Sequence, residues 1–175
     1  MAFLCVVGFT THAQFTSANL QATGLTCAMC SNAINKALVK VPFVASVKSD
    51  IKNSSFAIVF KEGQPVSIDA IKNAVEDAGF SVGSLQVTGK FDAVQVEKDK
   101  HVKIGNAVYH FLNTNEQLLQ GEKTITVVDK DFLTAKQFKK ISAASKMSCV
   151  SSGKAEKCCQ ADGVSPDARV YHVTI

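Results

Sequence analysis

Gly24-Leu25-Thr26-Cys27-Ala28-Met29-Cys30 is the stretch from which the fold of the amino-terminal half can be worked out. In the run before it, Leu20 and Ala22 alternate with polar residues, which is typical of a strand. After it, apolar residues recur at the three- and four-residue spacing of one helix face: Cys30, Ile34, Ala37, Leu38 and Val41. The sequence therefore predicts a strand, a loop that carries two cysteines, and a helix that begins at this loop.

The place of the two cysteines at a helix start bears on their chemistry. We expect Cys27 just before the helix and Cys30 in its first turn. The first amide N–H groups of a helix have no partner within it, and its positive end favours thiolates over thiols. Two such thiolates can converge on one ion, and they suit soft Cu(I) better than a hard cation. The pattern therefore predicts a metal-binding loop.

A Cys-x-x-Cys pair at a helix start is also typical of thioredoxin-like redox proteins. Those proteins usually carry a tryptophan before the pair and a proline inside it. Here Thr26 precedes the pair, Ala28 and Met29 lie within it, and the chain has no tryptophan. We favour metal binding, with a redox pair and an inert disulfide as the alternatives.

The residues that follow predict the rest of a small α+β unit. The first helix should end before Pro42. Alternating and continuous apolar runs then predict a strand hairpin over residues 43–51 and 56–60. Ser67 is expected to cap a second helix that ends at Gly79, and a strand over 80–87 should follow. The order strand, helix, strand, strand, helix, strand is the pattern of a ferredoxin-like βαββαβ sandwich.

Residues from about 18 to 87 resemble the heavy-metal-associated domain of copper chaperones and of the amino ends of copper-pumping P-type ATPases. The family motif G-M-T-C-x-x-C corresponds to GLTCAMC here, with Leu25 in place of the usual methionine. The family's A-G-[F/Y] mark before the last strand corresponds to Ala78-Gly79-Phe80. The resemblance implies that Leu25 packs under the loop and that Phe80 shields it without ligating the metal. Together with Met29, these side chains would form an apolar rim.

The resemblance also implies a function for the unit, to which we assign residues 14–88. Cys27 and Cys30 would bind Cu(I) and pass it to or from a metal-donor or metal-acceptor protein by exchange of thiolate ligands. Zn²⁺ or Hg²⁺ is the alternative cargo, although the zinc-handling members usually place a carboxylate beside the first cysteine, where this chain has Thr26. We expect no enzymatic activity. A periplasmic thiol–disulfide redox protein and a metal sensor or adaptor are the alternative functions.

The amino end has the composition of an export signal. Residues 1–13 contain an apolar run too short to span a bilayer, followed by Thr11-His12-Ala13, with a small residue at the expected cleavage point. A signal of this kind predicts a periplasmic or secreted protein, and a buried first strand is the alternative. No other stretch approaches the length of a membrane span, so we expect no stable membrane insertion. The net charge of +4 comes from lysines and arginines that are spread along the chain, which argues against nucleic-acid binding.

Residues 90–175 resemble no family that we recognise. Thr88-Gly89-Lys90 is the expected boundary. Strands are predicted over 91–96, 102–104, 107–112, 124–128 and 169–175, with a two-residue turn at Gly105-Asn106. Asp131 is expected to cap a single helix. This mostly-β or α+β pattern predicts a small barrel or sandwich, with the OB barrel as one candidate.

A second group of cysteines lies between that helix and the last strand. Cys149, Cys158 and Cys159 fall in a long irregular segment, of a kind that is often tied down or functional. A disulfide within this group is the first expectation, and a second soft-metal site is the alternative. His101, His110 and His172 could add ligands to such a site. The strand alternation, however, places His110 and His172 on the face of their strands opposite to that of their large apolar neighbours. A histidine on that face is more often exposed to solvent than bound to a metal.

Overall fold

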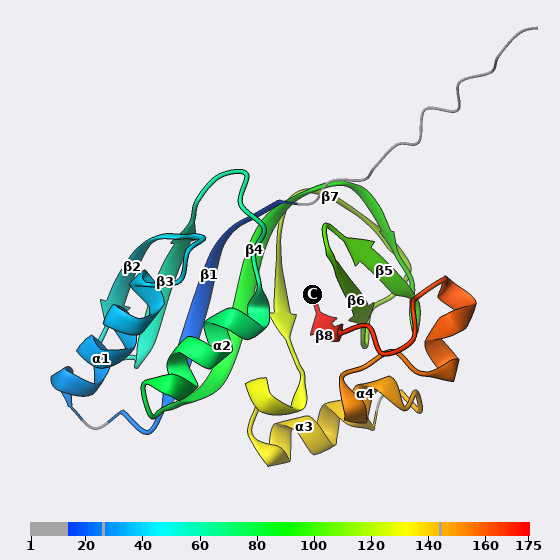
Figure 1. Ribbon diagram of the computed structural model, residues 1–175. Helices are drawn as coiled ribbons and strands as arrows, with labels where there is room; N and C mark the ends of the chain where they lie inside the picture. Colours follow the sequence, from blue (N-terminus) through cyan, green and yellow to red (C-terminus); the bar gives the residue numbers. More distant parts are fainter. Residues whose placement is uncertain (1–13, 26, 144) are drawn as a thin grey trace, which may run out of the picture.

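A computed structural model describes residues 14–175 except Thr26 and Ala144. The export signal predicted for residues 1–13 lies outside the described residues. The elements of the first half are β1 (Gln14–Thr23), α1 (Ala28–Val39), β2 (Val44–Asp50), β3 (Ser55–Phe60), α2 (Ile68–Asp77) and β4 (Ser81–Val96). Their strands pair antiparallel in the order β2-β3-β1-β4, and both helices lie on one face (Figure 1). The predicted ferredoxin-like arrangement is confirmed.

The two helices of this half form for the reasons that the sequence indicates. In α1 the expected stripe is turned inward, and Ile34 and Leu38 are fully buried. In α2 the Ser67 side chain accepts a hydrogen bond from the Ala70 amide at 3.2 Å, which caps the helix start. The α2 side chains that face the sheet are Ile68, Ile71 and Val75. Burial of these apolar side chains fixes how both helices sit on the sheet.

Strand β4 connects the two halves of the chain. It pairs with β1 through residues 81–90 and with β7 (Gln117–Val127) through residues 85–96. The boundary expected at Thr88-Gly89-Lys90 therefore lies inside a paired strand and not in a linker. The predicted strand over 91–96 is the end of this same strand. A bulge between Phe91 and Val94, where Ala93 has a φ of 50°, bends β4 at that point.

The second half adds four more strands to the sheet. They are β5 (His101–Ile104), β6 (Ala107–Phe111), β7 and β8 (Val170–Thr174), and the described strands form one eight-stranded sheet in the order β2-β3-β1-β4-β7-β8-β6-β5. The last strand lies between β7, to which it is antiparallel, and β6, to which it is parallel. The predicted hairpin at Gly105 is confirmed, with a φ of 58° at that glycine. An OB barrel is not confirmed, because these strands continue the sheet of the first half.

The helical content of the second half differs from the single predicted helix. The described residues of this half form two α-helices, α3 (Ala135–Ser142) and α4 (Cys149–Ser152), with one 3-10 turn before α3 at Lys130–Phe132 and another after α4 at Lys157–Asp162. Asp131 does not cap α3. Thr134 does so instead, in a reciprocal box with Gln137. The prediction missed this box because a Thr three residues before Gln is a weaker signal than an aspartate. No described helix is long and apolar enough to cross a membrane.

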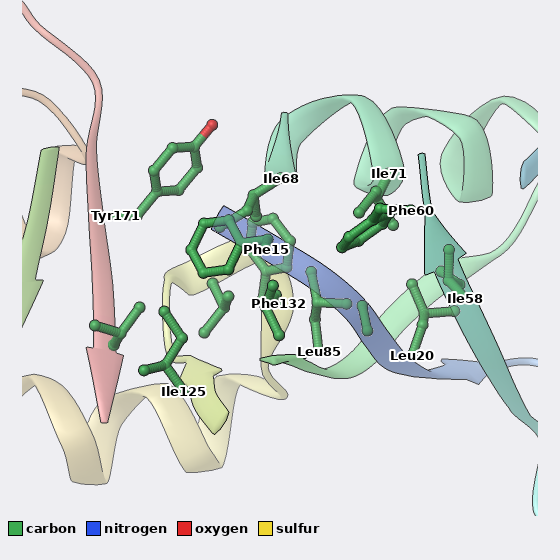
Figure 2. Packing of buried hydrophobic residues seen from close by; sticks show 14 of the residues in the cluster. Phe15, Leu20, Ile58, Phe60, Ile68, Ile71, Leu85, Ile125, Phe132 and Tyr171 are labelled. Atoms are coloured by element: carbon green, nitrogen blue, oxygen red, sulfur yellow. The ribbon is translucent and has the colours of Figure 1, made fainter. Parts of the chain in front are cut away.

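One hydrophobic core runs through both halves (Figure 2). Phe15 of β1 contacts Phe91 and Tyr109 edge to face, with ring centroids 6.3 and 5.9 Å away. Ile68 of α2 and Phe132 belong to the same cluster and are fully buried. A smaller cluster around Leu112, Val150 and Val170 lies under α4. The shared core explains why β4 passes without a break from one half to the other.

Candidate metal-binding site

The GLTCAMC loop connects β1 to α1, as predicted. Gly24, at the start of this loop, has a φ of 83°, a conformation that favours glycine. Cys27 is the N-cap residue of α1 in an extended conformation, and Cys30 lies in the first turn. The two Sγ atoms are 3.0 Å apart, with Cys27 exposed and Cys30 half-buried. The loop thus brings both sulfurs together at the molecular surface.

The start of α1 provides a positive environment for these sulfurs. The Cys27 carbonyl accepts hydrogen bonds from the amides of Cys30 and Ser31, at 3.2 and 3.4 Å. The preceding amides, of Ala28 and Met29, belong to the positions that have no acceptor within a helix. The first turn carries no acidic residue that would cancel the positive end of the helix dipole. This arrangement favours thiolates, the form in which cysteine binds metal.

The register of β1 and β4 places Phe80 beside the loop. Thr23 pairs with Ser81, so the next residues, Gly24 and Phe80, lie opposite one another. A Cβ atom on Gly24 would lie 4.0 Å from Phe80 Cδ1. Leu25 is partly buried against the core. Met29 is 82% exposed, so it projects into solvent beside the cysteines.

The two sulfurs of the loop lie closer together than a bound metal ion would hold them. With metal–sulfur bonds of about 2.3 Å, a two-coordinate ion would hold the sulfurs about 4.6 Å apart, and a tetrahedral ion about 3.8 Å apart. Both values exceed the 3.0 Å between Cys27 and Cys30. The sulfurs must therefore move apart to admit an ion. The exposed Cys27 side chain is free of packing that would oppose this movement.

The histidines and two of the later cysteines lie together in the second half. Strand register puts His101 beside His110 and His110 beside His172 on three neighbouring strands. Cys149 Sγ of α4 lies 3.7 Å from His101 Nε2 and 3.8 Å from His110 Nδ1. The Cys159 sulfur is also buried in this group, within 4.8 Å of the Cys149 sulfur and of a His101 ring nitrogen. The side chain of Cys158 lies outside the described residues.

The expectation that His110 and His172 face solvent is wrong, because both side chains are fully buried. The segment that carries Cys149 lies against the face of the sheet on which both histidines lie, and it covers them. Burial, together with His172 and His101, lowers the pKa of His110 to about 4, so this ring is neutral at pH 7. Sequence reasoning also missed the carboxylates of Asp99, Asp129 and Asp162, each of which faces one histidine. No spacing in the sequence links these pairs.

Comparison with known proteins agrees with the geometry of the first site. The Heavy-metal-associated domain family matches residues 20–81. The copper chaperone CopZ of Staphylococcus haemolyticus (strain JCSC1435) is 34% identical over 59 residues, which are 34% of this chain and 85% of the chaperone. Copper-transporting ATPase 1 of Rhizobium meliloti (strain 1021) is 36% identical over 66 residues, but the match spans only 8% of that protein.

A solved structure of a CopZ metallochaperone aligns with 38% of this chain and 98% of its own, at 25% identity and a TM-score of 0.36. The family match covers the end of β1, the loop with Cys27 and Cys30, and helix α1. Through this region the chain belongs to the heavy-metal-associated domain family.

Proposed function

We propose that the chain binds one Cu(I) ion through Cys27 and Cys30 and passes it on by exchange of thiolate ligands. The observation that carries this proposal is the pair of sulfurs 3.0 Å apart at the start of α1. Soft thiolates favour Cu(I) over a hard cation. The positive helix end, with no acidic residue in the first turn, favours the thiolate form of both cysteines. The relatives named above are a copper chaperone and a copper-transporting ATPase. An acceptor or donor of the same chemistry is the implied partner.

Transfer can proceed through the exposed side of the loop. Cys27 is exposed and Cys30 is half-buried, so an incoming thiolate reaches the ion beside Cys27. The new copper–sulfur bond forms first, giving a three-coordinate ion, and the bond to Cys27 then breaks. Repetition at Cys30 completes the transfer, with no change in the oxidation state of copper. Met29, which is 82% exposed next to the pair, offers a partner an apolar contact.

We place this activity in the periplasm or outside the cell, because residues 1–13 have the composition of an export signal. An oxidising compartment tends to close neighbouring cysteines into a disulfide. The Cys27–Cys30 pair would therefore have to bind copper before it is oxidised, or be kept reduced by its partner.

A thiol–disulfide redox protein is the second candidate, and the same distance favours it. The 3.0 Å between the sulfurs is only about 1 Å longer than a disulfide bond, which is about 2.05 Å. Closure of the pair would need little movement of the loop. The two functions differ in whether the two thiolates bind a metal ion or are oxidised to a disulfide.

Competition against a chromophoric Cu(I) chelator tests the first proposal. The full chain, the Cys27→Ser variant and the Cys30→Ser variant are titrated with Cu(I) under reducing, oxygen-free conditions. Each substitution should remove one equivalent of high-affinity Cu(I) and leave the far-ultraviolet circular dichroism unchanged. Asn32→Ala, an exposed change on α1, is the matched control and should bind like the parent chain. Unchanged stoichiometry and affinity in both cysteine variants would refute the site.

A further inference from the structure

The buried cluster in the second half contains two sets of metal-ligating side chains that share one cysteine. One set is His101, Cys149 and Cys159, and the other is His110, Cys149 and His172. Within each set the donor atoms lie within 4.8 Å of one another. Among the five residues, only His101 has any measurable exposure as a residue, and its side chain is buried. These ligands belong to β5, β6, β8, α4 and the 3-10 turn at Lys157–Asp162.

Carboxylates form hydrogen bonds with two histidines of the cluster, His101 and His172. His101 Nδ1 lies 2.7 Å from Asp162 Oδ2, which leaves Nε2 directed at Cys149 Sγ. His110 is turned the other way, with Nδ1 directed at the same sulfur, while its Nε2 faces Asp99 Oδ1 at 3.4 Å without a hydrogen bond among the described residues. A carboxylate behind a histidine is the usual outer-shell partner of a metal ligand, because it fixes the ring and its tautomer.

His172 adds an independent observation. Its Nδ1 lies 2.6 Å from Asp129 Oδ1, whereas its Nε2 is buried and has no hydrogen-bond partner among the described residues. A buried polar nitrogen in this condition costs free energy, so such atoms are rare in native proteins. Its presence beside Cys149 and His110 indicates that the cluster has room for a bound ligand that would pair with this nitrogen.

We propose that this cluster is a second metal site, which holds one Zn²⁺ ion between Cys149 Sγ, Cys159 Sγ, His101 Nε2 and His110 Nδ1. The distances from Cys149 Sγ to the two histidine nitrogens fit this ion, and the four donors, which come from the two sets, would draw together around it. With Zn–S bonds of about 2.3 Å and Zn–N bonds of about 2.05 Å, tetrahedral geometry separates sulfur from nitrogen by about 3.6 Å. The two distances measured from Cys149 Sγ are 3.7 and 3.8 Å. His172 Nε2 borders the same space.

Charge decides between zinc and copper at this site. Two thiolates carry a charge of −2, and the imidazoles are neutral as ligands. A divalent ion gives a neutral complex, whereas Cu(I) would leave one uncompensated negative charge in a buried position. Such a charge is costly unless it is paired. The carboxylates of Asp162 and Asp99 nearby would raise that cost for Cu(I) further.

The position of the site indicates a structural role. Cys149 and Cys159 belong to the irregular connection between α3 and β8, while the histidines belong to the β5–β6 hairpin. The side chains packed around the two cysteines form only a small hydrophobic cluster. A metal ion that joins the connection to the hairpin would supply stability that this small core lacks. Because its ligands are buried, this ion would not exchange with a partner in the way proposed for the surface loop.

The test uses the full chain with Cys27→Ser and Cys30→Ser, so that the proposed copper loop contributes nothing. After reduction, this parent variant should retain one equivalent of zinc through gel filtration, measured by elemental analysis. Zinc K-edge absorption should show two sulfur ligands at about 2.3 Å and two nitrogen ligands at about 2.0 Å. Adding zinc to the metal-free form should raise its melting temperature.

Substitutions in the same background locate the site. Cys149→Ser and His101→Gln should each abolish stoichiometric zinc binding. Asp162→Asn, behind His101, should weaken the affinity by about 10- to 100-fold. Ser151→Ala, an exposed change on the same short helix as Cys149, is the control and should bind zinc like the parent.

Three results would overturn the proposal, and none of them depends on the copper loop. They are substoichiometric zinc in the reduced parent variant, an absorption spectrum without sulfur ligands, and tight binding of Cu(I) with no binding of Zn²⁺. If Cys149→Ser fails to fold, the absorption spectrum of the parent still decides the outcome.

Discussion

The Arg169 guanidinium forms two hydrogen bonds with the Asp69 carboxylate, from Nε to Oδ2 at 3.0 Å and from Nη2 to Oδ1 at 3.2 Å. Asp69 lies in the first turn of α2 in the metal-binding half, and Arg169 directly precedes β8. Nη2 also donates to Asp129 Oδ2 at 2.8 Å, and Asp129 accepts from His172. This network connects the helix of the first half to a histidine of the buried cluster.

The first prediction is that Asp69→Asn lowers the free energy of unfolding of the whole chain by about 1 kcal/mol, the upper end for a partly exposed ion pair. The pair is bidentate and each side chain is one-third exposed, so it should contribute more than an ordinary surface pair. Lys72→Gln breaks the Lys72–Glu76 pair on the same helix and is the control. It should cost about 0.3 kcal/mol. Urea unfolding measures both, and equal effects would show that the contact with Arg169 adds nothing.

The second prediction concerns the independence of the metal-binding half. A fragment of residues 14–88 should fold and bind one Cu(I), because it contains the complete βαββαβ order. It should unfold at a lower urea concentration than the full chain. The fragment loses Phe91, which packs on Phe15, as well as β7 and the pair with Arg169. Circular dichroism measures the difference, and an unfolded fragment would mean that the second half supplies an essential part of the core.

The third prediction is that Gly89→Ala destabilises the chain by about 1–3 kcal/mol, the range for a side chain forced into a packed site. A Cβ atom here would lie 2.9 Å from the Gln14 carbonyl oxygen and 3.2 Å from Phe15 Cα. Since these are backbone atoms of the paired strand β1, they cannot rotate away. Lys90→Ala, at the exposed next position, is the control. A melting temperature equal to that of the control would show that β1 shifts without cost.

The fourth prediction separates a copper carrier from a thiol reductant. The full chain should reduce insulin disulfides no faster than free dithiothreitol, because nothing in the loop takes the place of the proline that thioredoxin-like proteins carry between their cysteines. Cu(I) should exchange with a dithiol acceptor within the mixing time, because Cys27 is exposed. Fast turnover of insulin together with a Cu(I) affinity no better than that of a free dithiol would support the redox alternative.

The sequence by itself determined the architecture around the GLTCAMC loop. Three local patterns predicted it: the helix stripe of Ile34 and Leu38, the Ser67 cap and the apolar strand runs. Each of them is present in the structure. Their periods follow directly from helix and strand geometry, so neighbouring residues suffice to read them. The two cysteines of the loop are only three residues apart, and the helix start that holds them is a local feature as well.

Only the tertiary structure decided how the second half is joined and what its histidines do. The continuation of β4 past Gly89 depends on β1 and β7, which pair with it from residues about 70 positions before and 35 positions after. The alignment of His101, His110 and His172 depends on the parallel pairing of β6 with β8, whose register no local pattern specifies. The register of such long-range pairs is determined by which side chains the whole sheet buries. That quantity depends on residues far apart in the sequence, so the histidine and cysteine cluster could be identified only in the tertiary structure.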